Sequence, residues 1–141
     1  MAKKKEKILV IEDDEQMVEF VKRVLEAHFY QVHSAPSAEE GLKKVKELSP
    51  DLIILDVMLE TKGEGFWTAQ KLKSTDAQSE YREYSHIPIL MLTAIHTQTE
   101  FRFSPETDGE YLPVEDFVEK PVEPGELVQK VKNLLTSKTQ S

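Results

Sequence analysis

The stretch Asp51-Leu52-Ile53-Ile54-Leu55-Asp56 places four consecutive apolar residues between two aspartates. An apolar run this short is typical of a strand that is buried on both faces, as in a parallel sheet. Ligands of open α/β sheets bind just beyond the carboxyl ends of the strands. Asp56 would lie at such an end, and is therefore a candidate reactive carboxylate. Aspartate is also a common strand terminator, and on this stretch alone that simpler interpretation is favoured.

The composition indicates one globular domain. The chain has 141 residues, of which 39% are hydrophobic and 31% charged, which is enough for a core but leaves no room for a second domain. No apolar run approaches the roughly 18 residues that span a bilayer. The basic start, residues 1–7, is not followed by the apolar segment of a signal peptide. We therefore expect a cytoplasmic protein with no membrane partner and a solvated N-terminal tail.

Charge and residue usage exclude several kinds of site. The formal net charge is -8, which disfavours a nucleic acid as partner, because such affinity comes largely from Lys and Arg on phosphates. The absence of cysteine excludes disulfides and thiolate metal sites. The spacing of the four histidines does not suggest a metal cluster (His28, His33, His86 and His96).

Apolar runs alternate with helical patterns along the chain. This alternation predicts a parallel sheet with helices on both faces. Ser37 and Glu40 are spaced as a capping box, which predicts a helix that runs to about Leu48. Residues 74–86 are expected to form a loop or an irregular helical extension, 95–116 show no helical face, and 136–141 are a polar tail. Strands are expected at residues 8–11, 30–34, 52–55, 89–92 and 117–119. Four helices are expected to face the core with apolar side chains: Val18, Val21, Leu25 and Phe29 in the first, Ala38, Leu42 and Val45 in the second, Phe66, Ala69 and Leu72 in the third, and Leu127, Val131 and Leu134 in the last.

Polar side chains occupy the carboxyl ends of four of these strands. With strand order 2-1-3-4-5, the switch point between strands 1 and 3 brings Glu12, Asp13 and Asp56 together. Carboxylates without His or Cys are hard ligands suited to Mg²⁺. A hydroxyl from Thr93 and an ammonium from Lys120 could hold phosphoryl oxygens, which leaves one carboxylate as nucleophile. The sequence thus predicts a Mg²⁺-dependent aspartyl-phosphate site.

The acidic cluster at residues 12–15 has a second interpretation. It lies between a strand end and a helix start, and acidic side chains stabilise helix N-termini. This accounts for one or two of the four carboxylates, and it is the favoured role for Asp14. Four like charges so close together still favour a counter-ion.

Four segments, in this order and at these spacings, resemble the receiver domains of two-component response regulators: residues 8–14, 51–58, 88–94 and 117–121. The resemblance implies a flavodoxin-like, doubly wound, five-stranded parallel sheet of order 2-1-3-4-5. It also implies a single receiver domain over residues 1–141, with a core at about 6–136. We expect it to stand alone, because no room remains for an output domain.

The same resemblance assigns roles to individual residues. Asp56 would accept a phosphoryl group from a sensor histidine kinase or phosphotransfer protein. Mg²⁺ would be held by Glu12, Asp13, Asp56 and the backbone carbonyl of Met58. Lys120 would contact the phosphoryl group and precede a cis bond to Pro121, while Thr93 and Phe117 would be the switch residues. The protein would catalyse only its own phosphorylation and dephosphorylation, and signal to a downstream protein.

The chain departs from this family between residues 95 and 116, where turn residues such as Pro105, Gly109 and Pro113 replace a regular fourth helix. We therefore expect an atypical fourth-helix region and carry over no standard partner surface.

Two other functions remain open. One is a receiver-like interaction module that is never phosphorylated. The other is an aspartyl-phosphate hydrolase of the haloacid dehalogenase type, against which Val57 and Met58 count, since that class has Asp-x-Asp. A nucleotide-binding domain lacks its Gly-rich loop.

Overall fold

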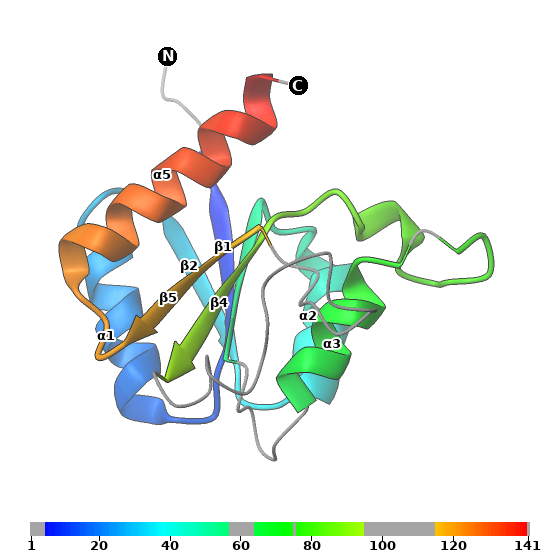
Figure 1. The fold of residues 1–141 in the computed structure, drawn as a ribbon, viewed down its shortest axis with the longest axis horizontal. Helices are drawn as coiled ribbons and strands as arrows, with labels where there is room; N and C mark the ends of the chain where they lie inside the picture. The colour runs from blue at the N-terminus through cyan, green and yellow to red at the C-terminus, as the bar shows by residue number, and fades with distance from the viewer. Residues whose placement is uncertain (1–4, 57–63, 75, 95–114, 141) are drawn as a thin grey trace.

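Five parallel strands form the centre of the molecule (Figure 1). The computed structural model describes residues 5–56, 64–74, 76–94 and 115–140, without the side chains of 64–66, 94 and 137–140. The strand order is β2-β1-β3-β4-β5, which confirms the order predicted from the sequence. The strands are β1 (Lys7–Ile11), β2 (Gln31–Ala35), β3 (Leu52–Asp56), β4 (Ile89–Ala94) and β5 (Asp116–Lys120).

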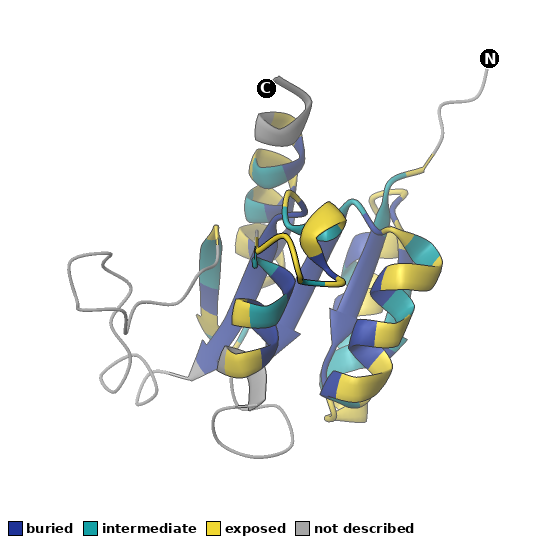
Figure 2. Ribbon diagram, turned by 90° about the vertical axis from the view of Figure 1, so that its right-hand side faces the viewer, coloured by how far each residue is buried: buried dark blue, intermediate teal, exposed yellow. Residues whose placement is uncertain are grey.

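Helices cover both faces of the sheet, as Figure 1 shows. The first face carries α1 (Glu15–Glu26) and α5 (Pro124–Gln140), and the second carries α2 (Ala38–Leu48) and α3 (Glu64–Leu72). Figure 2 shows the buried strands between helices whose outer sides are exposed. This is the predicted doubly wound α/β fold. No helix within the described ranges combines the length and apolarity that a bilayer crossing needs.

The central position of β3 explains its uninterrupted apolar run. Every residue of this strand is buried, including Asp56 at its end. Leu52 and Ile54 pack into the core beneath α1 and α5, whereas Ile53 and Leu55 pack into the core beneath α2 and α3. Because alternate side chains face opposite sides, a strand covered on both faces needs an apolar residue at each position.

Two predicted helix starts are confirmed by their capping bonds. Asp14 is the N-cap of α1, and its Oδ1 accepts from the backbone N–H of Gln16 at 2.9 Å and of Met17 at 3.4 Å. Ser37 caps α2, where its Oγ accepts from the N–H of Glu40 at 3.2 Å. Asp14 therefore has the helix-start role that its position in the sequence favoured.

The predicted inner face of the first helix is wrong at Phe29. The helix ends at Glu26, and Phe29 follows in a left-handed conformation with φ 72°. Its side chain is 76% exposed, while Tyr30 is buried instead. The backbone N–H of Tyr30 donates to the carbonyl of Leu25 at 3.2 Å, so the chain reverses before the helical spacing can bring Phe29 to the core.

The C-terminal boundary also differs from the prediction. Residues 136–141 were expected to be a polar tail, but α5 continues to Gln140. Residues such as Lys138 and Gln140 are good helix formers, and extending an existing helix costs far less than starting one. The polar composition that suggested a tail is therefore compatible with a final helical turn.

The connection between α3 and β4 matches its prediction, since its described residues form turns and the 3₁₀ turn η1 (Arg82–Tyr84). Other predictions concern residues outside the described ranges. These are the N-terminal tail at 1–4, the loop at 57–63 that contains Met58, and the atypical segment at 95–114.

Gly41 marks the closest approach of α2 to the sheet. A Cβ at this position would lie 2.6 Å from Cδ1, 2.8 Å from Cγ1 and 3.0 Å from Cγ2 of Ile11, which is fully buried. We expect Gly41→Ala to lower the free energy of unfolding by about 1–3 kcal/mol through overpacking, less a gain of up to about 1 kcal/mol in helix propensity. Urea unfolding measures the difference.

Gly125→Ala is the matched control for this substitution. The atoms nearest to its Cβ would be those of the flexible Glu123 carboxylate, from 3.1 Å, in the exposed first turn of α5. We expect unfolding of this variant to be unchanged or slightly harder. A Gly41→Ala protein as stable as the Gly125→Ala protein would contradict the close packing of α2.

Candidate functional site

Acidic side chains from the ends of two strands meet at the carboxyl edge of the sheet. Glu12 and Asp13 follow β1, and Asp56 ends β3. A carboxylate oxygen from each of these three residues lies within 4.8 Å of the others. Glu12 and Asp56 are buried and Asp13 is exposed, so the cluster opens to solvent on one side. The structure therefore brings together the three acidic residues that the sequence placed at the switch point.

Lys120, the last residue of β5, supplies the cation of the site. Its Nζ lies 3.2 Å from Asp56 Oδ2, to which it donates a hydrogen bond, and 3.6 Å from Glu12 Oε1. Burial works to lower the pKa of Lys120, but the negative charges of Asp56 and Glu12 outweigh it and leave the pKa above its ordinary value. Lys120 therefore stays protonated. The predicted cis bond between Lys120 and Pro121 is confirmed.

Glu12 is a buried carboxylate whose two oxygens differ in their hydrogen bonding. Its Oε2 accepts from the backbone N–H of Asp14 at 3.1 Å. Its Oε1 is buried and, within the described part of the chain, has no hydrogen-bond partner. Burial, followed by the neighbouring Asp56, raises the pKa of Glu12 to about 8, against the opposing effects of the Asp14 N–H and Lys120. A carboxyl group with a pKa near 8 marks a site where burial and a neighbouring carboxylate both disfavour the charged form.

These residues fit a divalent cation. Carboxylate oxygens are the ligands that Mg²⁺ prefers, and Glu12 Oε1 is a buried acceptor without a hydrogen bond beside two other carboxylates. Among the described residues, no other group of His, Asp or Glu has metal-binding spacing. The predicted carbonyl ligand at Met58 lies outside the described residues, as does His96.

The two predicted switch residues lie on adjacent strands. Thr93 of β4 is fully buried, one position beyond Leu92, which pairs with Asp56. Phe117 of β5 is half-buried and packs against the core beneath α2 and α3. Because side chains alternate along a strand, Thr93 and Phe117 lie on the sheet face that α2 and α3 cover. By the same alternation, Glu12, Asp56 and Lys120 belong to the face that α1 and α5 cover. Their role in switching stays a prediction.

Asp51 and Lys130 both bond to backbone groups of the sheet. Asp51, at the opposite end of β3, accepts from the backbone N–H of Lys7 at 2.8 Å, in keeping with the structural role expected for it. Sequence reasoning missed Lys130 of α5, which donates to the carbonyl of Phe117 at 2.6 Å. The one available signal was a lysine on the last helix, on the side that faces an edge strand.

Comparison with known families agrees with this geometry. The family model described as "Response regulator receiver domain" matches residues 8–132. The chain belongs to this family. A crystal structure of a putative response regulator from Chloroflexus aurantiacus is 32% identical, has a TM-score of 0.75, and is matched over 94% of this chain and 99% of that one.

Curated relatives of this receiver are longer proteins. The alkaline phosphatase synthesis transcriptional regulatory protein PhoP of Bacillus subtilis is 36% identical over 92% of this chain and 48% of its own length. The hybrid signal transduction histidine kinase D of Dictyostelium discoideum is 33% identical over 93% of this chain and 8% of its own. The chain thus spans about half, or much less, of these relatives.

The raised pKa of Glu12 predicts an unusual pH dependence of stability in metal-free protein. Its carboxyl titrates near 8 when folded and near 4.5 when unfolded, so the folded state holds more protons between these values. We therefore expect the free energy of unfolding to fall as pH rises from 5 to 8, by up to about 1.4 kcal/mol per pH unit. Urea unfolding in the presence of a chelator measures this slope.

The Glu12→Gln variant is the control, because all other titrating groups remain. We expect the free energy of unfolding of this variant to depend less on pH. For the wild-type protein at pH 8, we expect added Mg²⁺ to restore the stability that is lost in chelator. Parallel wild-type and Glu12→Gln profiles in chelator would show that the buried carboxyl is not the cause.

Proposed function

We propose that this receiver acts alone in the cytoplasm and accepts a phosphoryl group on Asp56 in a Mg²⁺-dependent reaction. The donor is a phosphohistidine of a sensor histidine kinase or phosphotransfer protein. The phosphorylated chain then changes a protein-binding surface or passes the group on, and it contacts no nucleic acid or membrane. The observation that carries the proposal is Lys120 Nζ, 3.2 Å from Asp56 Oδ2 and beside a Glu12 oxygen without a hydrogen bond.

The transfer step requires a nucleophile, a cation and an in-line approach. An oxygen of the Asp56 carboxylate forms a bond to phosphorus as the N–P bond of the donor breaks, and the donor imidazole keeps the electron pair. Lys120, held cationic by its two carboxylate neighbours, offsets the negative charge of the transferring group. The hydroxyl of Thr93, on the adjacent strand, is a donor for one phosphoryl oxygen.

Magnesium would be bound by Glu12, Asp13 and Asp56, with the expected carbonyl of Met58, and would neutralise charge on the phosphoryl group. Glu12 must lose its proton before it can act as a ligand, so metal affinity should increase with pH up to about 8. In this proposal the protein catalyses only its own phosphorylation and dephosphorylation.

The decisive experiment incubates the protein with Mg²⁺ and acetyl phosphate, and measures intact mass. We expect one phosphoryl group on wild type and none on Asp56→Asn, because the amide cannot act as the nucleophile. Beryllofluoride with Mg²⁺ should bind wild type and fail to bind Asp56→Asn. Chelation of Mg²⁺ should prevent both results.

Asp51→Asn is the matched control, since it makes the same chemical change at the other end of the same strand. Asp51 bonds to a backbone N–H of β1, so its loss should affect stability but leave modification intact. An unmodified wild type would favour the fixed interaction module instead. Steady release of phosphate with turnover would favour a hydrolase.

A further inference from the structure

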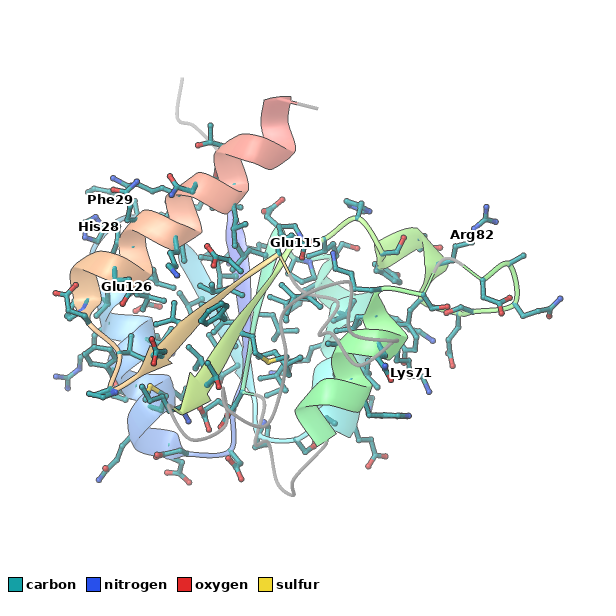
Figure 3. The ribbon with its side chains drawn as sticks, in the orientation of Figure 1. His28, Phe29, Lys71, Arg82, Glu115 and Glu126 are labelled. Carbon is teal, nitrogen blue, oxygen red and sulfur yellow. The ribbon has the colours of Figure 1, made fainter. Side chains whose placement is uncertain are left out.

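Lys130 of α5 binds the middle of β5. Its Nζ donates to the carbonyl of Phe117 at 2.6 Å and lies 3.4 Å from Asp116 Oδ1 and 5.3 Å from the centre of the Phe117 ring. Glu126, one turn earlier on α5 (Figure 3), lies 3.7 Å from the same ammonium. One half-buried cation thus contacts a carbonyl, two carboxylates and an aromatic face.

These contacts occur on an edge strand. Among the strands of the described residues, β5 pairs with β4 alone and is the last strand of the sheet on that side. At Phe117 the backbone groups are bonded to side chains, since the N–H donates to Asp116 Oδ1 at 2.8 Å and the carbonyl accepts from Lys130. Lys130 thus supplies a directional bond that a further strand would otherwise provide.

The start of β5 is held separately by Glu115 (Figure 3). Its Oε1 accepts from the N–H of Ile89 at 2.7 Å, and its Oε2 lies 2.7 Å from Lys73 Nζ. Lys73 also donates to the carbonyl of Ile87 at 2.7 Å. The strand is therefore held just before its start, at Glu115, and at Phe117. Lys120 lies beyond both contacts, at the end of the strand.

We infer that Lys130 is a positioning residue for phosphoryl acceptance: it fixes β5 so that Lys120, three residues further along the strand, meets Asp56. The inference rests on the function proposed above. The apolar contacts of Val118 with the α5 core set the spacing between helix and strand, but such contacts are not directional. The hydrogen bond and ion pair of Lys130 restrict sliding and twisting of the strand. Transfer rates are sensitive to misplacement of a charge by a fraction of an ångström.

A matched control exists at the other edge of the sheet. Lys44 of α2 donates to the carbonyl of Ser34 in β2 at 2.8 Å, which is the same kind of contact between a helix lysine and an edge-strand carbonyl. β2 carries none of the residues that would contact the phosphoryl group. Lys44→Met therefore removes an equivalent contact without reaching the cation of the site.

The experiment compares wild type with Lys130→Met, Lys130→Arg and Lys44→Met, as monomers verified by sedimentation. The readouts are the rate of modification by acetyl phosphate at saturating Mg²⁺, and the affinities for beryllofluoride and for Mg²⁺. We expect Lys130→Met to slow modification and weaken beryllofluoride binding by about three- to tenfold. Lys130→Arg, which keeps the charge and donors, and Lys44→Met should stay within about twofold of wild type. Mg²⁺ affinity should be unchanged throughout, because the carboxylates hold the ion.

A double-mutant cycle tests whether Lys130 acts through Lys120. In a Lys120→Met background, Lys130→Met should weaken beryllofluoride binding no further. Additive losses, an equal loss in Lys44→Met, or wild-type behaviour of Lys130→Met would each overturn the inference and leave the proposed function standing. A wild type that accepts neither acetyl phosphate nor beryllofluoride would overturn both.

Discussion

The contact between Lys120 and Asp56 joins two strands that are not neighbours, because β4 lies between β3 and β5. It therefore depends on the register of three strands. Asp56 pairs with Leu92, and Lys120 pairs with Ala94, two residues further along β4. Positions two apart lie on the same face of a sheet, so this register aims the cation and the carboxylate to the same side. A slip of one residue in either pairing would separate them.

The same alternation divides the carboxyl edge of the sheet into two halves. Val10, Ile54 and Val118 point into the core beneath α1 and α5, and the next residue of equal parity on each strand is Glu12, Asp56 or Lys120. Thr93 and Phe117 have the parity of Met91, which packs beneath α2 and α3. The acidic site and the pair expected to report its state thus lie on opposite faces. A hydroxyl that follows the phosphoryl group would carry a change from one face of the sheet to the other.

The acidic site also lowers the stability of the metal-free fold. Two carboxylates are buried beside a single ammonium, and one of them keeps an oxygen without a hydrogen bond among the described residues. Such an arrangement is costly in metal-free protein, and the raised pKa of Glu12 is its direct consequence. An apolar replacement would make a more stable sheet edge. In the proposed function these charged groups serve as metal ligands and as the nucleophile, roles for which a carboxylate oxygen must remain available.

The sequence predicted the features that depend on local pattern. The apolar run of β3, the caps at Asp14 and Ser37, and the polar strand ends all follow from spacing and residue type. The position of Phe29 was predicted wrongly because the helical spacing of apolar residues continues past Leu25. The backbone, however, is left-handed at Phe29 itself. A glycine there would have indicated the end of the helix, and the sequence has none. The contacts of Lys73 and Lys130 were not predicted either. The partners of a long side chain depend on the folded arrangement and produce no periodic pattern in the sequence.

These lysine contacts bear on the atypical segment between β4 and β5. Its ends are Ala94, which pairs with Lys120 at the carboxyl edge, and Glu115, which is bonded to Ile89 and paired with Lys73 at the opposite edge. The first end adjoins Thr93 and the site, whereas the second is fixed by hydrogen bonds and an ion pair. The described residues on either side of this segment are therefore held in different ways: Glu115 by side-chain bonds, and Ala94 by its strand pairing with Lys120. Because Lys120 shares its register with Ala94, the cation of the site depends on the end of β4 as well as on the contacts that hold the start of β5.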